Sequence, residues 1–263
     1  PGVDLLDLRL YVVVQATLFF SLILSGAFAL FSHSPRKTLF VLGSGAFLHL
    51  FLDAFQVKWA NGVHFFAPFD WRLTQFALFW PESLPTYVVT VLGLSYMLFH
   101  WRKSSRLSWP IHLQSKRYFC AAVVLLLVYL ILPLAFLKAS EARDNHFVKT
   151  LREVAARPGK LIEFDRAFYR YENNKAGGKL ISFGGEVFDV KGLTLNDSSN
   201  ISIRGVFIDS NTVQVQAYHL HPSYFRDNAS YVGLAFITFL WGLSGFSAWT
   251  AWKRRRKHGR QAL

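Results

Sequence analysis

A histidine and an aspartate interrupt an apolar stretch in the first quarter of the chain. His49 and Asp53 are four residues apart in FLHLFLDAF, so on a helix they share one face, a turn from each other. The surrounding segment 38–57 has the length and apolar composition of a membrane-spanning helix. An ionisable group at that depth costs free energy unless it faces a partner or a wet cavity. An imidazole and a carboxylate held in register suit a divalent ion such as zinc, so we predict a metal site here.

The same pair also has a structural explanation, in which a buried histidine and its carboxylate hold two helices together. For the isolated pair the two explanations weigh about equally, and further ligand types decide between them. Asp4 and Asp7 precede the first apolar segment, and His64 follows the second. Taken singly, the two acids suit the N-terminal end of any helix, and His64 suits a membrane interface. Together they favour the metal site.

The composition indicates a membrane protein with a soluble part. The 263 residues are 52% hydrophobic and 17% aromatic, and the mean hydropathy is +0.25. A single cysteine excludes an internal disulfide and any cysteine-based zinc site within the chain. No cleavable signal peptide is visible, and because the chain begins at Pro1 we expect residues upstream of it.

The positive charge marks membrane topology rather than a nucleic-acid partner. The net charge is +13, but thirteen of the cations lie in three short acid-free clusters beside apolar segments, at 36–37, 102–117 and 253–260. This is the pattern of cytoplasmic loops. The long polar region 138–227 carries 13 basic and 11 acidic residues and is nearly balanced. We therefore expect no nucleic-acid binding.

We predict a multi-pass α-helical membrane protein with about five spans and one small β domain. The expected spans are 10–31, 38–57, 86–101, 118–137 and 229–252. An amphipathic helix over 138–157 leads into alternating, β-branched runs over 160–221. Those runs predict an antiparallel domain of about five strands, an OB-like barrel or a sandwich. The expected domains are 1–137 with four spans and the metal site, 138–228 with the helix and β domain, and 229–263 with the last span and a basic tail.

The charge clusters also predict an orientation. If the three clusters face the cytoplasm, the chain start, the connector 58–85 and the β domain all lie on the other side of the membrane, outside the cytoplasm. At 1.5 Å per residue, His49 and Asp53 lie roughly 16 and 22 Å along their span, in its outer half. Asp4, Asp7 and His64 then reach the same face. His33 falls at the opposite end.

The first 72 residues resemble the YdjM-like family of predicted bacterial membrane-bound metal-dependent hydrolases. The matching motifs are HLFLD with His49 and Asp53, then NGVHFFAPF with Gly62 and the pair Pro68-Phe69. PGVD at the start of the chain is similar to the family's upstream P-D-x-D motif, with Gly2 in place of its first aspartate. The resemblance does not extend to the β domain.

This resemblance implies metal-assisted hydrolysis. His49, Asp53 and Asp4 would hold a divalent ion that lowers the pKa of a bound water. Asp7 or His64 would act as the base or as a further ligand. A site at the outer face of the membrane suits a lipid or lipid-linked substrate. Gly2 in the upstream motif argues against a full two-metal site.

The alternative function is not enzymatic. The chain would then be a membrane anchor or scaffold that presents its extracytoplasmic β domain to an envelope partner, with His49 and Asp53 joining helices. The β domain of about 60 residues supports this alternative, since a minimal hydrolase does not need it.

Overall fold

The computed structural model describes residues 4–104, 115–144, 146–172, 177–221 and 230–239, together with residues 228, 242 and 250. The chain forms two compact units. The first contains residues 1–81 and 113–223, and the second contains residues 82–112 and 224–263. The first unit holds the β domain and most of the described helices, so it carries the argument below.

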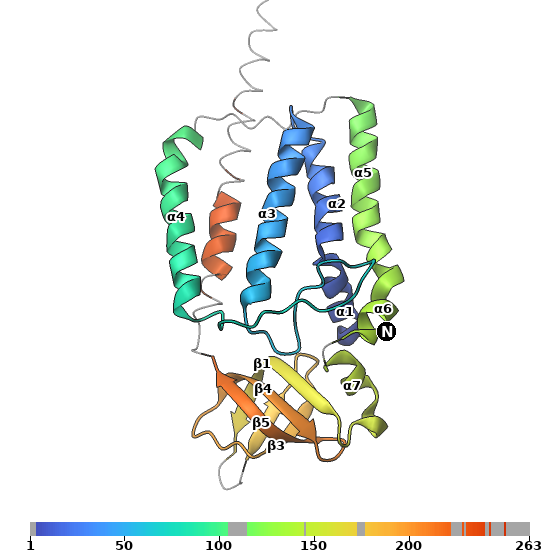
Figure 1. The fold of residues 1–263 in the computed structure, drawn as a ribbon, viewed down its shortest axis with the longest axis vertical. Helices are drawn as coiled ribbons and strands as arrows, with labels where there is room; N and C mark the ends of the chain where they lie inside the picture. The colour runs from blue at the N-terminus through green and yellow to red at the C-terminus, as the bar shows by residue number, and fades with distance from the viewer. Residues whose placement is uncertain are drawn as a thin grey trace, which may run out of the picture. The chain divides into compact units, whose positions relative to one another are not determined.

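The first unit contains helices that precede and follow a connector, and the connector lies between them and the β domain (Figure 1). The helices are α1 (Leu5–Gln15), α2 (Leu18–Ala29), α3 (Pro35–Phe55), α5 (Lys116–Ile131), the 3-10 helix η1 (Leu132–Phe136) and α6 (Leu137–Ala142). The Asp4 carboxylate accepts the Leu6 N–H at 2.9 Å and so caps α1. Proline stands in the first turn of α3, where its missing N–H costs nothing.

The expectation of five spans is not met in the described residues. Two helices are long and apolar enough to cross a membrane: α3, and the run Lys116–Ala142 that includes α5 and α6. The pair α1 and α2, bent by 69° at its break, would make a third if it counts as one span. The second unit holds α4 (Leu84–Ser104), whose apolar part Leu84–His100 is shorter, and a helix over Ser230–Phe239. The rest of the expected fifth span lies almost wholly outside the described residues.

The β domain is a closed five-stranded barrel, as the sequence predicted. Its strands are β1 (Leu161–Tyr171), β2 (Gly178–Ile181), β3 (Val187–Lys191), β4 (Ser199–Phe207) and β5 (Thr212–Leu220). Their order around the barrel is β1-β2-β3-β5-β4. All neighbours are antiparallel except the parallel pair β3 and β5. This is an OB-like barrel.

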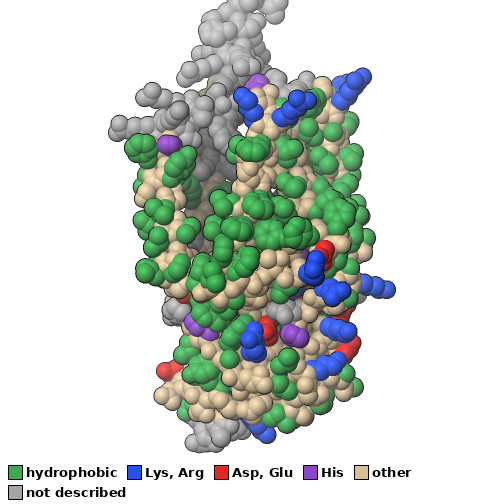
Figure 2. Space-filling view, viewed as in Figure 1, with side chains coloured by type: hydrophobic (Ala, Val, Ile, Leu, Met, Phe, Trp, Pro, Cys, Tyr) green, Lys and Arg blue, Asp and Glu red, His purple; other side chains and the backbone are tan. Residues whose placement is uncertain are grey.

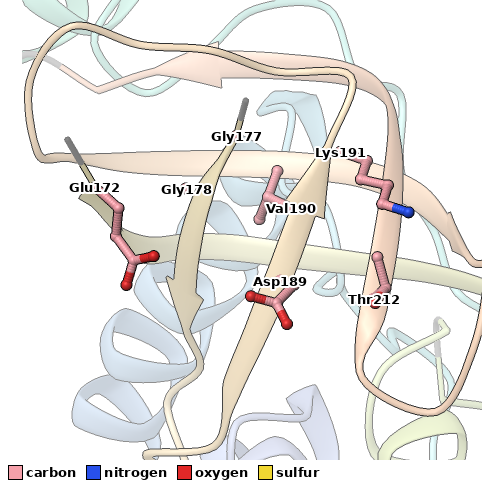
Figure 3. A pocket seen from close by; sticks show the side chains of 7 residues that line it. All are labelled: Glu172, Gly177, Gly178, Asp189, Val190, Lys191 and Thr212. Carbon is pink, nitrogen blue, oxygen red and sulfur yellow. The ribbon is translucent and has the colours of Figure 1, made fainter. Parts of the chain in front are cut away.

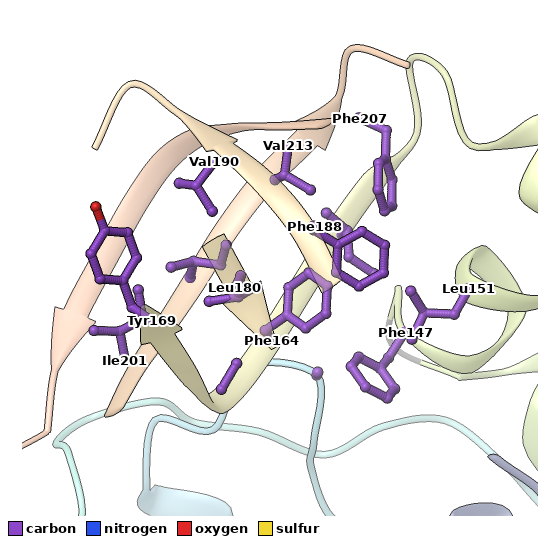
Figure 4. Close-up of a cluster of buried hydrophobic side chains, with 14 of the residues drawn as sticks. Phe147, Leu151, Phe164, Tyr169, Leu180, Phe188, Val190, Ile201, Phe207 and Val213 are labelled. Atoms are coloured by element: carbon purple, nitrogen blue, oxygen red, sulfur yellow. The ribbon is translucent and has the colours of Figure 1, made fainter. Parts of the chain in front are cut away.

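Aromatic and aliphatic residues together fill the barrel (Figure 4). Phe164 and Phe188 pack at 5.4 Å between ring centroids, and Phe188 and Phe207 at 5.6 Å. Tyr169 is fully buried against Gly178, where a Cβ atom would come within 2.3 Å of the tyrosine ring. That close approach explains the glycine at the start of β2.

A broken helical segment closes one end of the barrel, in place of the single helix expected over 138–157. After α6 the chain turns at Asp144, whose carboxylate accepts the N–H groups of Phe147 and Val148 at the start of α7 (Val148–Arg152). A 3-10 turn, η2 (Val154–Ala156), follows. Phe147 packs edge-on against Phe164 in the barrel, 5.6 Å between centroids.

Arg157, directly after η2, is a buried cation at this end of the barrel. Its two terminal nitrogens bind the two carboxylate oxygens of Glu186 at 2.7 and 3.1 Å, and they also donate to the carbonyls of Leu151 and Ser210. The guanidinium lies 5.4 and 5.5 Å from the ring centroids of Phe188 and Phe207. Neighbouring polar and aromatic groups thus compensate the loss of water around this charge.

Candidate functional site

The histidine and aspartate of α3 do lie together, but a lysine neutralises the carboxylate. The His49 Nε2 atom is 3.8 Å from an Asp53 oxygen, and the same oxygen binds Lys58 Nζ at 2.8 Å. Lys58 comes just after the end of α3, and only 17% of its side chain is exposed. The His49 side chain is 75% exposed. The chain itself therefore supplies a cation to the Asp53 carboxylate.

The two N-terminal acids bind an arginine from the segment that closes the barrel. Arg152 Nη2 contacts Asp4 at 3.1 Å and Asp7 at 2.5 Å, and Arg152 Nη1 contacts Glu141 at 3.0 Å. Burial acts to lower the pKa of Arg152, but its hydrogen bonds with Asp7 and Glu141 raise it overall, so it stays charged. The Leu6 N–H and Arg152 hold the pKa of the Asp4 carboxyl below its usual value.

These placements do not assemble the expected ligand set. Among the described residues, no group of three potential ligand atoms within 4.8 Å includes Asp4, His49 or Asp53. Asp4 and Asp7 both bind Arg152, so Asp4 is grouped with Asp7 and not with His49 and Asp53. The metal-binding role of these residues stays a prediction.

His64 is a buried residue of the connector. Its Nδ1 atom lies 3.0 Å from the Trp71 carbonyl oxygen, which can only accept, so Nδ1 carries the proton. Burial lowers the pKa of His64, against the opposing effect of this hydrogen bond. The neutral ring packs 5.7 Å from the Trp71 indole. These contacts shape the connector, and the catalytic role expected for His64 stays untested.

The connector, residues 56–81, is an irregular segment that binds the barrel through the outer face of β1 and β4. The Ala60 N–H donates to Glu163 Oε2 at 2.8 Å, and Arg204 Nε donates to Glu163 Oε1 at 2.7 Å. Arg204 also lies 5.2 Å from the Trp59 ring. From α1, Arg9 donates to the Ala60 carbonyl at 2.5 Å. Helix, connector and barrel thus meet at one point, and Glu163 is 4% exposed there.

A hydrogen-bonded chain runs through the same junction. Asn61 donates to Asp165 Oδ2 at 3.0 Å, and the Ser202 hydroxyl donates to Asp165 Oδ1 at 3.1 Å. The Ser202 oxygen lies 2.7 Å from His221 Nε2. Because the single hydroxyl proton goes to Asp165, the His221 Nε2 atom must be the donor in this contact. The order is carboxylate, hydroxyl, imidazole, so Ser202 is not arranged as a nucleophile activated by a histidine base.

His219 lies next to His221, two residues away on β5. The two ring centroids are 4.9 Å apart, and the His219 ring stacks on the Trp80 indole at 3.8 Å and 3° between planes. Burial, then the proximity of His221 and Arg166, lower the pKa of His219. Two imidazoles side by side are suitable ligands for a borderline divalent ion. The sequence showed this His-x-His spacing, but it gave no sign of Trp80 or Ser202 beside it.

A small pocket at the ends of β2, β3 and β5 is a weak candidate for a ligand site (Figure 3). Its volume is about 210 Å³, and its lining includes Gly177, Val190 and Thr212. That is below the roughly 300–1,000 Å³ usual for small-molecule sites. The functional argument therefore rests on the junction.

The residues that organise the junction were not singled out from sequence. Lys58, Arg152, Glu163 and Arg204 have no local spacing in the sequence that marks the groups they contact. The one available signal was Glu163, an acid between the apolar residues Ile162 and Phe164, because a buried carboxylate needs donors.

Comparison with known proteins identifies no family. No protein-family model and no curated protein matches the chain. One solved structure that is similar to part of it is the S. pombe Stn1–Ten1 complex. The identity is 10%, the match covers 31% of this chain and 82% of that one, and the TM-score is 0.23.

Proposed function

We propose that this chain is a non-enzymatic membrane anchor that holds an OB-like barrel at the outer face of the bacterial inner membrane and presents it to an envelope partner. One observation carries the proposal: the acids expected as metal ligands already bind cations of the chain. Asp53 binds Lys58, while Asp4 and Asp7 bind Arg152. The last of these contacts ties α1 to the segment that closes the barrel. Polar groups thus fix the barrel to the helices.

The barrel leaves one face for a partner. The connector covers the outer side of β1 and β4, at Glu163 and Arg204. Further along β1, Phe168 pairs with Ile181 of β2, which pairs with Val187 of β3. Phe168 and Val187 are exposed, and Phe183 in the β2–β3 hairpin is 63% exposed. This apolar row, Phe168, Ile181, Phe183 and Val187, suits a partner with an apolar strip.

A photo-crosslinking amino acid at position 183, in intact cells, tests the presentation of this face. We expect a discrete cross-linked species that is absent when the same group replaces Lys160, which directly precedes β1, lies outside the apolar row and has a side chain that is 41% exposed. The same result at both positions, or no product at 183, would count against the proposal.

The second candidate is the metal-dependent hydrolase, and the 3.8 Å approach of His49 to Asp53 favours it. The effect of replacing Lys58 distinguishes the two functions. If Lys58 only neutralises Asp53, Lys58→Met lowers stability by about 1–3 kcal/mol, because Asp53 loses its counter-charge, and no metal is bound. If a divalent ion belongs at Asp53, Lys58 competes with it, so Lys58→Met increases the metal affinity.

Metal analysis and thermal unfolding of the detergent-purified protein distinguish these outcomes. We expect no stoichiometric zinc or manganese in the wild type, and no change in Tm on adding zinc to Lys58→Met. About one ion per chain, lost in Asp53→Asn, would instead establish the hydrolase site. Lys160→Met is the matched control, because Lys160 forms an ion pair with Glu153 that is exposed on both sides.

A further inference from the structure

Helices α2, α3 and α5 line an open apolar groove. Its volume is about 430 Å³, and it is lined by Phe19, Leu22, Ile23, Gly26, Leu39 and Leu125. Gly26 opens the groove, because it has no side chain on the side that faces α5. No charged group lines it, so a polar ligand would lose its hydration there without compensation. The groove suits a hydrocarbon chain.

Four cations lie at the end of the same helices. Arg36 and Lys37 are in the first turn of α3, and Lys116 and Arg117 begin α5. All four are exposed, and none forms an ion pair with another described residue. Figure 2 shows Lys and Arg side chains gathered at this end, above a surface of hydrophobic side chains. Cations in the first turn oppose the helix dipole, so an anionic partner would offset an unfavourable placement.

The groove begins close to these charges. Leu39 follows Arg36 by three residues, roughly 4.5 Å along α3, and Leu125 follows Arg117 by eight, roughly 12 Å along α5. An amphiphile with its headgroup at the cations would therefore extend its chain into the groove. A neutral lipid would satisfy the groove but not the charges.

We propose that this groove and its four cations form a binding site for one anionic phospholipid, with an acyl chain between α2, α3 and α5 and the phosphate at the cations. The inference rests on the membrane location in the proposed function. It adds a lipid class and a position, on the side that the charge pattern assigns to the cytoplasm.

Gly26→Ile tests the groove. A Cβ atom at this position makes only an ordinary 3.5 Å contact with Leu125, so the longer side chain fills the groove without a backbone clash. Gly45→Ile is the control, because Gly45 is exposed on α3 and a Cβ there meets nothing within 4 Å. Each methylene displaced from an apolar site costs about 0.8 kcal/mol, or about fourfold in affinity. We expect Gly26→Ile to weaken lipid retention at least about tenfold.

The full chain is reconstituted in nanodiscs of phosphatidylcholine alone and of an equal mixture with phosphatidylglycerol. Native mass spectrometry then counts the retained lipids. We expect the wild type and Gly45→Ile to retain phosphatidylglycerol selectively. Replacing the cations by glutamine should lower retention about fivefold for each cation removed, because each contributes about 1 kcal/mol at an anionic surface.

Three results would overturn the proposal. If the wild type retains both lipids equally, the cations do not select the headgroup. If Gly26→Ile and Gly45→Ile retain phosphatidylglycerol equally, the groove does not hold the acyl chain. If Gly26→Ile alone lowers the Tm in phosphatidylcholine nanodiscs, another helix of the chain occupies the groove. Failure of the proposed function is a separate outcome, since a chain without membrane spans would remain soluble after detergent removal.

Discussion

The contact between the connector and the barrel depends on one buried carboxylate, and Glu163→Gln tests it. Glu163 accepts the Ala60 N–H and the Arg204 Nε–H, one on each oxygen. A glutamine can accept only one of these and turns an NH2 group toward the other donor. If the NH2 group faces Ala60, which is 3% exposed, the buried N–H is left unpaired at a cost of about 1–3 kcal/mol. If it faces Arg204, which is half exposed and regains water, the junction still loses a hydrogen bond to a charged group, worth about 1.5–3 kcal/mol. We expect a net loss near 2 kcal/mol at the junction.

Hydrogen exchange of the peptide that contains Ala60 measures this loss locally. A change of about 2 kcal/mol corresponds to roughly 30-fold faster exchange of that amide, if it exchanges by local opening. Glu153→Gln is the matched control. Its ion pair with Lys160 is exposed on both sides, so we expect a change below about 0.5 kcal/mol and no faster exchange near Ala60. If the Ala60 amide in Glu163→Gln exchanges at the wild-type rate, the junction does not depend on this carboxylate.

Three further predictions concern the barrel and the pH dependence of the junction. Arg157→Ala should destabilise the barrel by about 3–5 kcal/mol, because it leaves Glu186 and two carbonyls without their donor, and denaturant unfolding measures this. Gly178→Ala should lower the free energy of unfolding by more than about 1 kcal/mol in the same assay, since the new Cβ atom would clash with the Tyr169 ring. The pKa of His219 is lowered in the folded state, so the unfolded chain binds its proton more tightly and stability should fall as the pH drops below about 6.5. Thermal unfolding between pH 5 and 8 measures this, and His219→Gln should flatten the profile, whereas an unchanged profile would refute this assignment to His219.

Local patterns determined much of the fold. The 3.6-residue and 2-residue periods of apolar side chains are properties of adjacent positions, so the sequence predicted the helical segments and the five-stranded barrel. The expected count of five spans was not met in the described residues. Length and hydropathy do not show where a helix breaks. The chain bends by 69° between α1 and α2, and the segment 138–157 breaks at Asp144.

In the candidate site, too, contacts between near neighbours in the sequence were predictable and contacts between distant residues were not. The approach of His49 to Asp53 follows from helix geometry over four residues, and the sequence predicted it correctly. The partners that decide what those groups do are non-local. Arg152 meets Asp4 and Asp7 across more than 140 residues, and Glu163 meets Ala60 across 103. A charged residue has many partners of opposite sign along the chain, and only the closure of the barrel and the path of the connector select one. The sequence thus determined which groups need a counter-charge, and the tertiary structure decided that the chain supplies it.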